Sequence, residues 1–218
     1  MITKIQLQGD AAVLAEDGNK LGSLERVVVN VSSKVITDIV VRIGGILRQE
    51  ERIVPIELIV ETAENKILLH EDAGELNGFP PLEEKRLVGE HGRRERGSPS
   101  GNMPAGLGGM PVVGTPVAPA SNEQIVTRLE QNIPEGTVAM RMGAKVTSAD
   151  DKHIGNVERV LAEPFMAQIT HLYVSSGLLV KSASLIPIDW VLRIGEDAVH
   201  LRVSKESVEE SADTPIPA

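Results

Sequence analysis

The feature that most constrains this chain is an internal repeat. Residues 17–44, shifted by 133 positions, align with residues 150–177, and nine of the 28 aligned pairs are identical. After a one-residue deletion, Pro55-Ile56 aligns with Pro187-Ile188 and Leu69 with Leu201. Similarity of a chain to itself at a fixed spacing indicates that one structural unit is used more than once. The chain is therefore a tandem duplication.

Each copy predicts six short β-strands, because β-branched runs alternate with turn residues such as Asp17-Gly18-Asn19. The predicted strands are 11–15, 20–31, 35–43, 52–55, 57–62 and 66–70 in the first copy, and 144–148, 153–162, 169–175, 184–187, 189–194 and 198–203 in the second. Six strands in about 70 residues close most readily into a small barrel, since an open sheet would leave two unprotected edges. Gly22 and Gly155 fall within predicted strands, where glycine indicates a bulge or a sharp bend.

A linker separates the copies. Between residues 97 and 120, six Gly and five Pro account for 11 of 24 positions, which is incompatible with a regular helix or strand. A short helix is predicted over 122–133, capped by Asn122 and stopped by Pro134. The predicted fold is thus all-β, with a first barrel at 1–78, a charged and then Pro/Gly-rich flexible linker at 79–134, a second barrel at 135–210 and a flexible tail at 211–218.

Composition excludes several classes of function. The chain has no cysteine, which removes disulfides, Cys-ligated zinc, iron–sulfur clusters and thiol catalysis, and which favours a reducing, cytoplasmic compartment. A net charge of −9 and only four aromatic residues argue against a nucleic-acid partner. The sequence contains no run of 18 apolar residues, so it predicts no membrane-spanning helix.

Three segments of the first copy carry a family resemblance: Asp-Gly-Asn-Lys-Leu-Gly-Ser-Leu-Glu-Arg-Val-Val-Val (17–29), Ile-Thr-Asp-Ile-Val-Val-Arg-Ile-Gly-Gly (36–45) and Ile-Val-Pro-Ile-Glu-Leu-Ile (53–59). They closely resemble the PRC-barrel domain, and residues 150–160, 169–177 and 186–191 repeat the pattern. The domain is known from the cytoplasmic part of the H subunit of photosynthetic reaction centres and from the carboxy-terminal half of a ribosome-maturation factor. The resemblance implies two β-barrels that mediate protein–protein contacts without chemistry of their own.

The residues themselves also predict no catalytic, cofactor-binding or metal site. The five histidines, at 70, 91, 153, 171 and 200, lack the spacing of a zinc site. His171 and Tyr173 share a strand face, which is more typical of a half-exposed strand than of a ligand pair. Glu25-Arg26 and Glu158-Arg159 are retained in both copies, as are Gly22 and Gly155. We expect the two Glu-Arg pairs to hold neighbouring strands or turns, with an interface role as the alternative.

The large side chains best suited to anchor a protein partner lie in the second copy: Phe165, Met166, Tyr173 and Trp190. The first copy has Ser32, Ser33, Val40 and Leu58 at the matching positions. The competing interpretation is that Tyr173 and Trp190 fill the second core while Phe165-Met166 packs over a barrel end. We expect a cytoplasmic, non-enzymatic adaptor that docks on a larger assembly. Formation of homo-oligomers is compatible with this expectation. The alternatives are a ribosome-maturation-type factor that binds a ribosomal protein and an accessory protein similar to the reaction-centre H subunit.

Overall fold

The β-branched runs of the two copies form two seven-stranded sheets in the computed structural model, which describes residues 4–45, 48–73, 76–89, 125–176 and 182–212. Each predicted strand segment contains a strand, although 3-10 turns at Ile56–Leu58 and Ile188–Trp190 replace the starts of two of them. The fold is mostly β, as the sequence predicts, and the described residues contain one α-helix, at a place where none was predicted. Among the described residues, no helix has the length and apolar character needed to cross a membrane.

The first sheet has the strand order β5-β4-β3-β2-β7-β6, with β10 added beside β3. Neighbouring strands are antiparallel except β2 and β7, which run parallel. The strands are β2 (Ala12–Leu14), β3 (Lys20–Asn30), β4 (Ile36–Gly45), β5 (Arg48–Pro55), β6 (Ile59–Ala63), β7 (Lys66–Leu69) and β10 (Thr137–Arg141).

The second sheet repeats this order as β14-β13-β12-β11-β16-β15, with β1 added beside β12. The parallel pair recurs as β11 and β16. The strands are β1 (Ile5–Gln8), β11 (Lys145–Thr147), β12 (His153–Ala162), β13 (Ile169–Ser176), β14 (Ser182–Pro187), β15 (Val191–Ile194) and β16 (Ala198–Leu201). We refer to residues 4–84 as the first half and to residues 131–212 as the second half.

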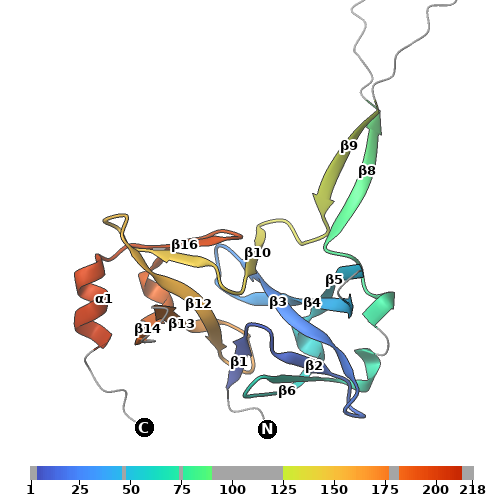
Figure 1. Cartoon of the computed structure of the whole chain (residues 1–218), viewed down its shortest axis with the longest axis horizontal. Coiled ribbons are helices and arrows are strands. Elements are labelled where there is room, and N and C mark those ends of the chain that lie inside the picture. Colours follow the sequence, from blue (N-terminus) through green and yellow to red (C-terminus); the bar gives the residue numbers. More distant parts are fainter. Residues whose placement is uncertain (1–3, 46–47, 74–75, 90–124, 177–181, 213–218) are drawn as a thin grey trace, which may run out of the picture. The chain divides into compact units, whose positions relative to one another are not determined.

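The two halves exchange their first strands (Figure 1). Strand β1 is the first strand of the first half in sequence but pairs with β12 of the second sheet, where Ile5 lies opposite Ala162. Strand β10 is the first strand of the second half but pairs with β3 of the first sheet, where Val138 lies opposite Val29. These two registers coincide when the repeat is superposed. Each sheet is therefore completed by a strand from the other half, so the tandem arrangement is an exchanged one.

A second reciprocal contact joins the turns between the long strands of each half. The amide N–H of Ile36 donates to the carbonyl of Ala167, and the amide N–H of Ile169 donates to the carbonyl of Lys34, both at 2.9 Å. Lys34 and Ala167 occupy equivalent positions and both have a positive φ, of 59° and 50°. The shared geometry shows that the halves meet with the same local symmetry at this contact as at the exchanged strands.

One hydrophobic cluster runs through both halves. It contains Leu7, Val27 and Met140 together with Val160 and Leu172, none of which is exposed. Leu7 on β1 and Met140 on β10 are the exchanged contributions. Because burial of apolar surface is the dominant favourable term in folding, a core continuous across the halves couples their stability.

Gly22 and Gly155 occupy equivalent places where two strands approach closely. A Cβ atom added at Gly22 would lie 2.5 Å from the carbonyl oxygen of Arg42, and one added at Gly155 would collide with the carbonyl oxygen of Ser175. The strand register shifts beside both glycines, which fits the predicted bulge. These positions require glycine for lack of space.

Two elements differ from the sequence prediction around the linker and the tail. Residues 125–131 form strand β9 (Ile125–Gln131), paired with β8 (Glu83–Gly89), where a helix was predicted over 122–133. This prediction is wrong because Ile125, Val126 and Thr127 are consecutive β-branched residues, which favour a strand over a helix. The Pro/Gly-rich residues 97–120 and the end of the tail, 213–218, lie outside the described residues.

Helix α1 (Lys205–Ala212) spans the predicted boundary between the second barrel, expected to end at residue 210, and the flexible tail. Its Val208 is 3% exposed and takes the place in the core that Leu76 has in the first half. Asp150 accepts hydrogen bonds from the Ser148 hydroxyl at 2.7 Å and from the backbone N–H of Lys205 at 3.1 Å, and pairs with the Lys152 ammonium at 2.9 Å. These contacts, with the Ser148 hydrogen bond first, hold the pKa of the Asp150 carboxyl well below its usual value.

Candidate interaction surface

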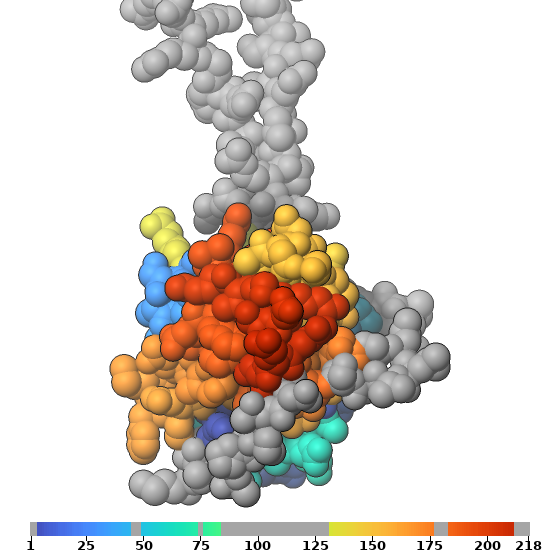
Figure 2. Space-filling model, turned by 90° about the vertical axis from the view of Figure 1, so that its left-hand side faces the viewer, coloured from blue at the N-terminus to red at the C-terminus, as the bar shows by residue number. Residues whose placement is uncertain are grey.

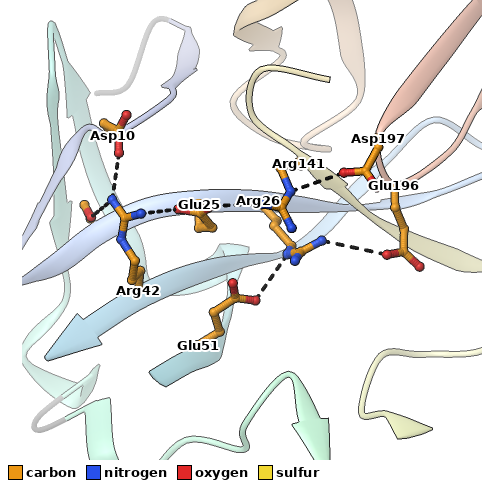
Figure 3. A network of polar contacts seen from close by, with 9 residues as sticks. Asp10, Glu25, Arg26, Arg42, Glu51, Arg141, Glu196 and Asp197 are labelled. Carbon is orange, nitrogen blue, oxygen red and sulfur yellow. Dashed lines mark hydrogen bonds and ion pairs between the residues drawn. The ribbon is translucent and has the colours of Figure 1, made fainter. Parts of the chain in front are cut away.

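An ionic network joins strands of the first sheet to the second half (Figure 3). Glu25 on β3 pairs with Arg42 on β4 at 2.9 Å and with Arg141 on the exchanged strand β10 at 3.7 Å. At the two ends, Arg42 pairs with Asp10 at 2.8 Å and Arg141 with Asp197 at 3.2 Å. The network therefore links three strands of the first sheet to a turn of the second half.

Arg26, which follows Glu25, is 6% exposed and pairs with two further carboxylates. Its Nε lies 3.2 Å from Glu51 on β5, and its Nη1 lies 3.8 Å from Glu196 in the second half. A buried guanidinium needs such partners, because removing a charge from water without compensation is costly. Glu25 and Arg26 thus hold neighbouring strands and turns in this structure.

The second half has lost most of this network. At the positions of Arg42 and Glu51 it has Ser175 and Ala183, which face each other in the same register. No described carboxylate pairs with Arg159, the equivalent of Arg26, and its buried Nε has no hydrogen-bond partner. Instead, its guanidinium carbon lies 5.3 Å from the ring centroid of Tyr173, a cation–π contact.

Tyr173 lies on the outer face of β13, between buried neighbours that point into the core. Leu172 and Val174 belong to the core cluster, so strand alternation directs Tyr173 outward. It pairs with Arg159 on β12 and with Leu185 on β14, and both Tyr173 and Leu185 are partly exposed. We call Leu161, Tyr173 and Leu185, with Arg159 and His171 beside them, the Tyr173 face.

His171 lies on this same face, opposite Leu161. Its Nδ1 is buried and has no hydrogen-bond partner among the described residues. Burial, together with the nearby charge of Lys4, lowers the pKa of the imidazole. Arg159 Nε and His171 Nδ1 are thus two buried polar atoms on one face that have no hydrogen-bond partner in the described part of the chain.

The remaining predicted contact residues lie elsewhere in the second half. Phe165 and Met166 are in the turn between β12 and β13 and are 87% and 64% exposed, so they do not pack over a barrel end. Trp190 lies in the 3-10 turn before β15 and packs against the core. The structure therefore does not bring the four residues Phe165, Met166, Tyr173 and Trp190 into one cluster. Figure 2 shows that residues of the second half, in orange and red, fill most of this view.

The junction of the halves contains an open cleft of about 410 Å³ that brings the two repeated glutamates to the same cavity. Glu25 lines it together with its partner Arg42, whereas Glu158 has no ion-pair partner among the described residues, since Ser175 replaces Arg42 and Gln8 replaces Arg141. No group of three metal-ligating side chains is found in the described part of the chain. This cleft therefore offers hydrogen-bonding groups without a recognisable metal site.

Sequence reasoning pointed to Tyr173 but missed the residues that define its surroundings. Leu161, Leu185 and Ala183 are small or aliphatic residues with no chemical signature of their own. A signal was available in the repeat: the change from Glu51 to Ala183 beside a retained arginine leaves one charge without its partner. Of the five histidines, His91 lies outside the described residues.

Comparison with known proteins gives one finding for this chain. Residues 9–76 match the family model of the PRC-barrel domain. The match covers strands β2 to β7, which are six of the seven strands of the first sheet. A search of curated proteins gave no match.

Proposed function

We propose that this chain, which carries a PRC-barrel domain at residues 9–76, is a non-enzymatic adaptor of the cytoplasm that docks on a larger protein assembly. The PRC-barrel domain belongs to a family of protein-interaction modules. The absence of cysteine fits a reducing compartment. In this proposal the second half makes the main contact with the partner, and the first half supports it.

The observation that carries the proposal is the difference between equivalent positions of the two halves. The turn after β3 carries Ser32 and Ser33, whereas the turn after β12 carries Phe165 and Met166 with most of their surface in solvent. Aromatic residues and methionine are enriched in the cores of protein interfaces and are costly to leave in water. Because both turns have the same place in the fold, the fold alone does not account for the large side chains.

Photo-cross-linking in the native host tests this proposal. A benzophenone-bearing amino acid is introduced at position 165, and the matched control carries it at position 32, the equivalent exposed site of the first half. We expect a discrete protein adduct from position 165 that position 32 does not give. Identification of the adduct by mass spectrometry then separates a general adaptor from a ribosomal-protein binder or a reaction-centre accessory protein. Identical adducts from both positions, or none from position 165, would contradict the proposal.

A further inference from the structure

The first half covers its own outer face with a segment of the chain. Leu82 is 1% exposed and packs against Val28, Val40 and Ile53. The Ile53 amide donates to the carbonyl of Pro80, and the Leu82 amide donates to the carbonyl of Glu51, both at 3.0 Å. The short segment from Pro80 to Leu82 therefore behaves as an added strand on the free edge of β5.

The Tyr173 face is the equivalent surface of the second half. Leu161, Tyr173 and Leu185 replace Val28, Val40 and Ile53 at the same register positions. No described segment hydrogen-bonds to the free edge of β14, the strand equivalent to β5. An edge strand with unpaired backbone groups beside apolar side chains is the arrangement to which proteins add an extended peptide.

The charges on the face indicate what such a peptide carries. In the first half, Glu83 follows the covering Leu82 and lines a cleft of about 580 Å³ together with Arg26. Arg26 already has Glu51 as a partner, but the second half has Ala183 at the position of Glu51, and no described carboxylate pairs with Arg159. A carboxylate placed where Glu83 lies in the first half would therefore meet an unpaired guanidinium in the second.

We propose that the Tyr173 face binds an extended segment of a partner protein that adds to β14 as a strand and places a branched aliphatic residue, followed by an acidic residue, on this face. The aliphatic side chain covers Tyr173 and Leu185, and the carboxylate pairs with Arg159. This inference rests on the proposed function, because it assumes a protein partner, and it specifies the chemistry of that partner.

A peptide taken from the chain itself is the probe. Labelled Gly-Phe-Pro-Pro-Leu-Glu-Glu, the sequence of residues 78–84, is titrated with the full chain, and binding is followed by fluorescence anisotropy. We expect saturable binding that weakens about tenfold with Arg159→Gln in the protein and about tenfold with Glu83→Gln in the peptide. Combining the two changes should add no further loss, since both remove the same ion pair.

A peptide N-methylated at the position of Leu82 tests the added strand without altering the protein. It keeps the side chain but removes the amide donor that, in the first half, bonds to the carbonyl of Glu51. We expect this peptide to lose most of its binding. Unchanged binding of the N-methyl peptide, or additive losses from Arg159→Gln and Glu83→Gln, would overturn the proposal.

Other occupants of the face give different results. Peptide binding that requires removal of residues 213–218 would assign the face to the carboxy-terminal segment of the same chain. Self-association that Arg159→Gln abolishes would assign it to a second copy. Either result would overturn the proposal that a segment of a partner protein binds this face. An adduct at position 165 without peptide binding refutes this inference alone, whereas the absence of the adduct refutes the proposed function.

Discussion

Leu7 belongs to the first half by sequence, but replacing it by Ala should destabilise the second half. Leu7 lies on β1, is fully buried and pairs with Val160 of the second sheet. Removal of a buried leucine side chain costs about 2–5 kcal/mol, from the lost transfer free energy and the cavity left behind. For a domain of this size, about 2–4 °C per kcal/mol gives a fall in melting temperature of about 4–20 °C.

The single tryptophan makes this effect visible. Trp190 lies in the second half and packs against the core, so its fluorescence follows the unfolding of that half, whereas far-UV circular dichroism follows both sheets. We expect urea transitions measured by the two probes to coincide in Leu7→Ala and to shift together. Leu192→Ala is the matched control, because Leu192 is 63% exposed and its removal should cost less than about 0.5 kcal/mol. A Trp190 transition unmoved by Leu7→Ala would show that β1 does not complete the second sheet.

Three further outcomes are expected. Gly22→Val and Gly155→Val should each lower the free energy of unfolding by about 1–3 kcal/mol or more, because the new Cβ collides with a backbone carbonyl oxygen; unchanged denaturation midpoints would contradict the close approach. Replacing both Phe165 and Met166 by Ser should reduce partner capture with little change in melting temperature, since both side chains are exposed; a sharp fall in melting temperature would assign them to the fold. The lowered pKa of Asp150 contributes stability that is fully present above the ordinary carboxyl pKa of about 3.9 and is lost as the pH falls through the lowered value. Asp150→Asn should therefore flatten the acid limb of the stability curve, and an unchanged acid limb would be evidence against this role.

The strands could be predicted from the sequence because the pattern that specifies them is local. Runs such as Val27-Val28-Val29 and turns such as Asp17-Gly18-Asn19 determine where each strand begins and ends. The exchange of β1 and β10 could not be predicted in this way, since each strand has the same alternation whichever sheet it joins. Its destination depends on pairing between residues more than 100 positions apart.

The candidate surface was predictable in part. The repeat drew attention to Tyr173, because a valine occupies the matching position of the first half. The packing of Leu82 against Val40 could not be predicted from the sequence, because Leu82 follows the repeated strands and contacts Val40 only in the folded chain. Helix α1 was missed because Val208 is the only branched aliphatic residue in its sequence, and a single such residue gives no helical periodicity.

Amide hydrogen exchange at Leu185 is the most direct test of the claim that the second half binds a partner through the edge of β14. The Ile53 amide is already bonded to Pro80 in the free chain and should exchange slowly with or without partner. The Leu185 amide has the equivalent position on β14, and no described residue outside the sheet accepts a hydrogen bond from it, so it should exchange rapidly in the free chain. We predict strong protection of Leu185, and none added at Ile53, when the cross-linked partner is bound. Leu185 exchange that the partner leaves unchanged would contradict the account.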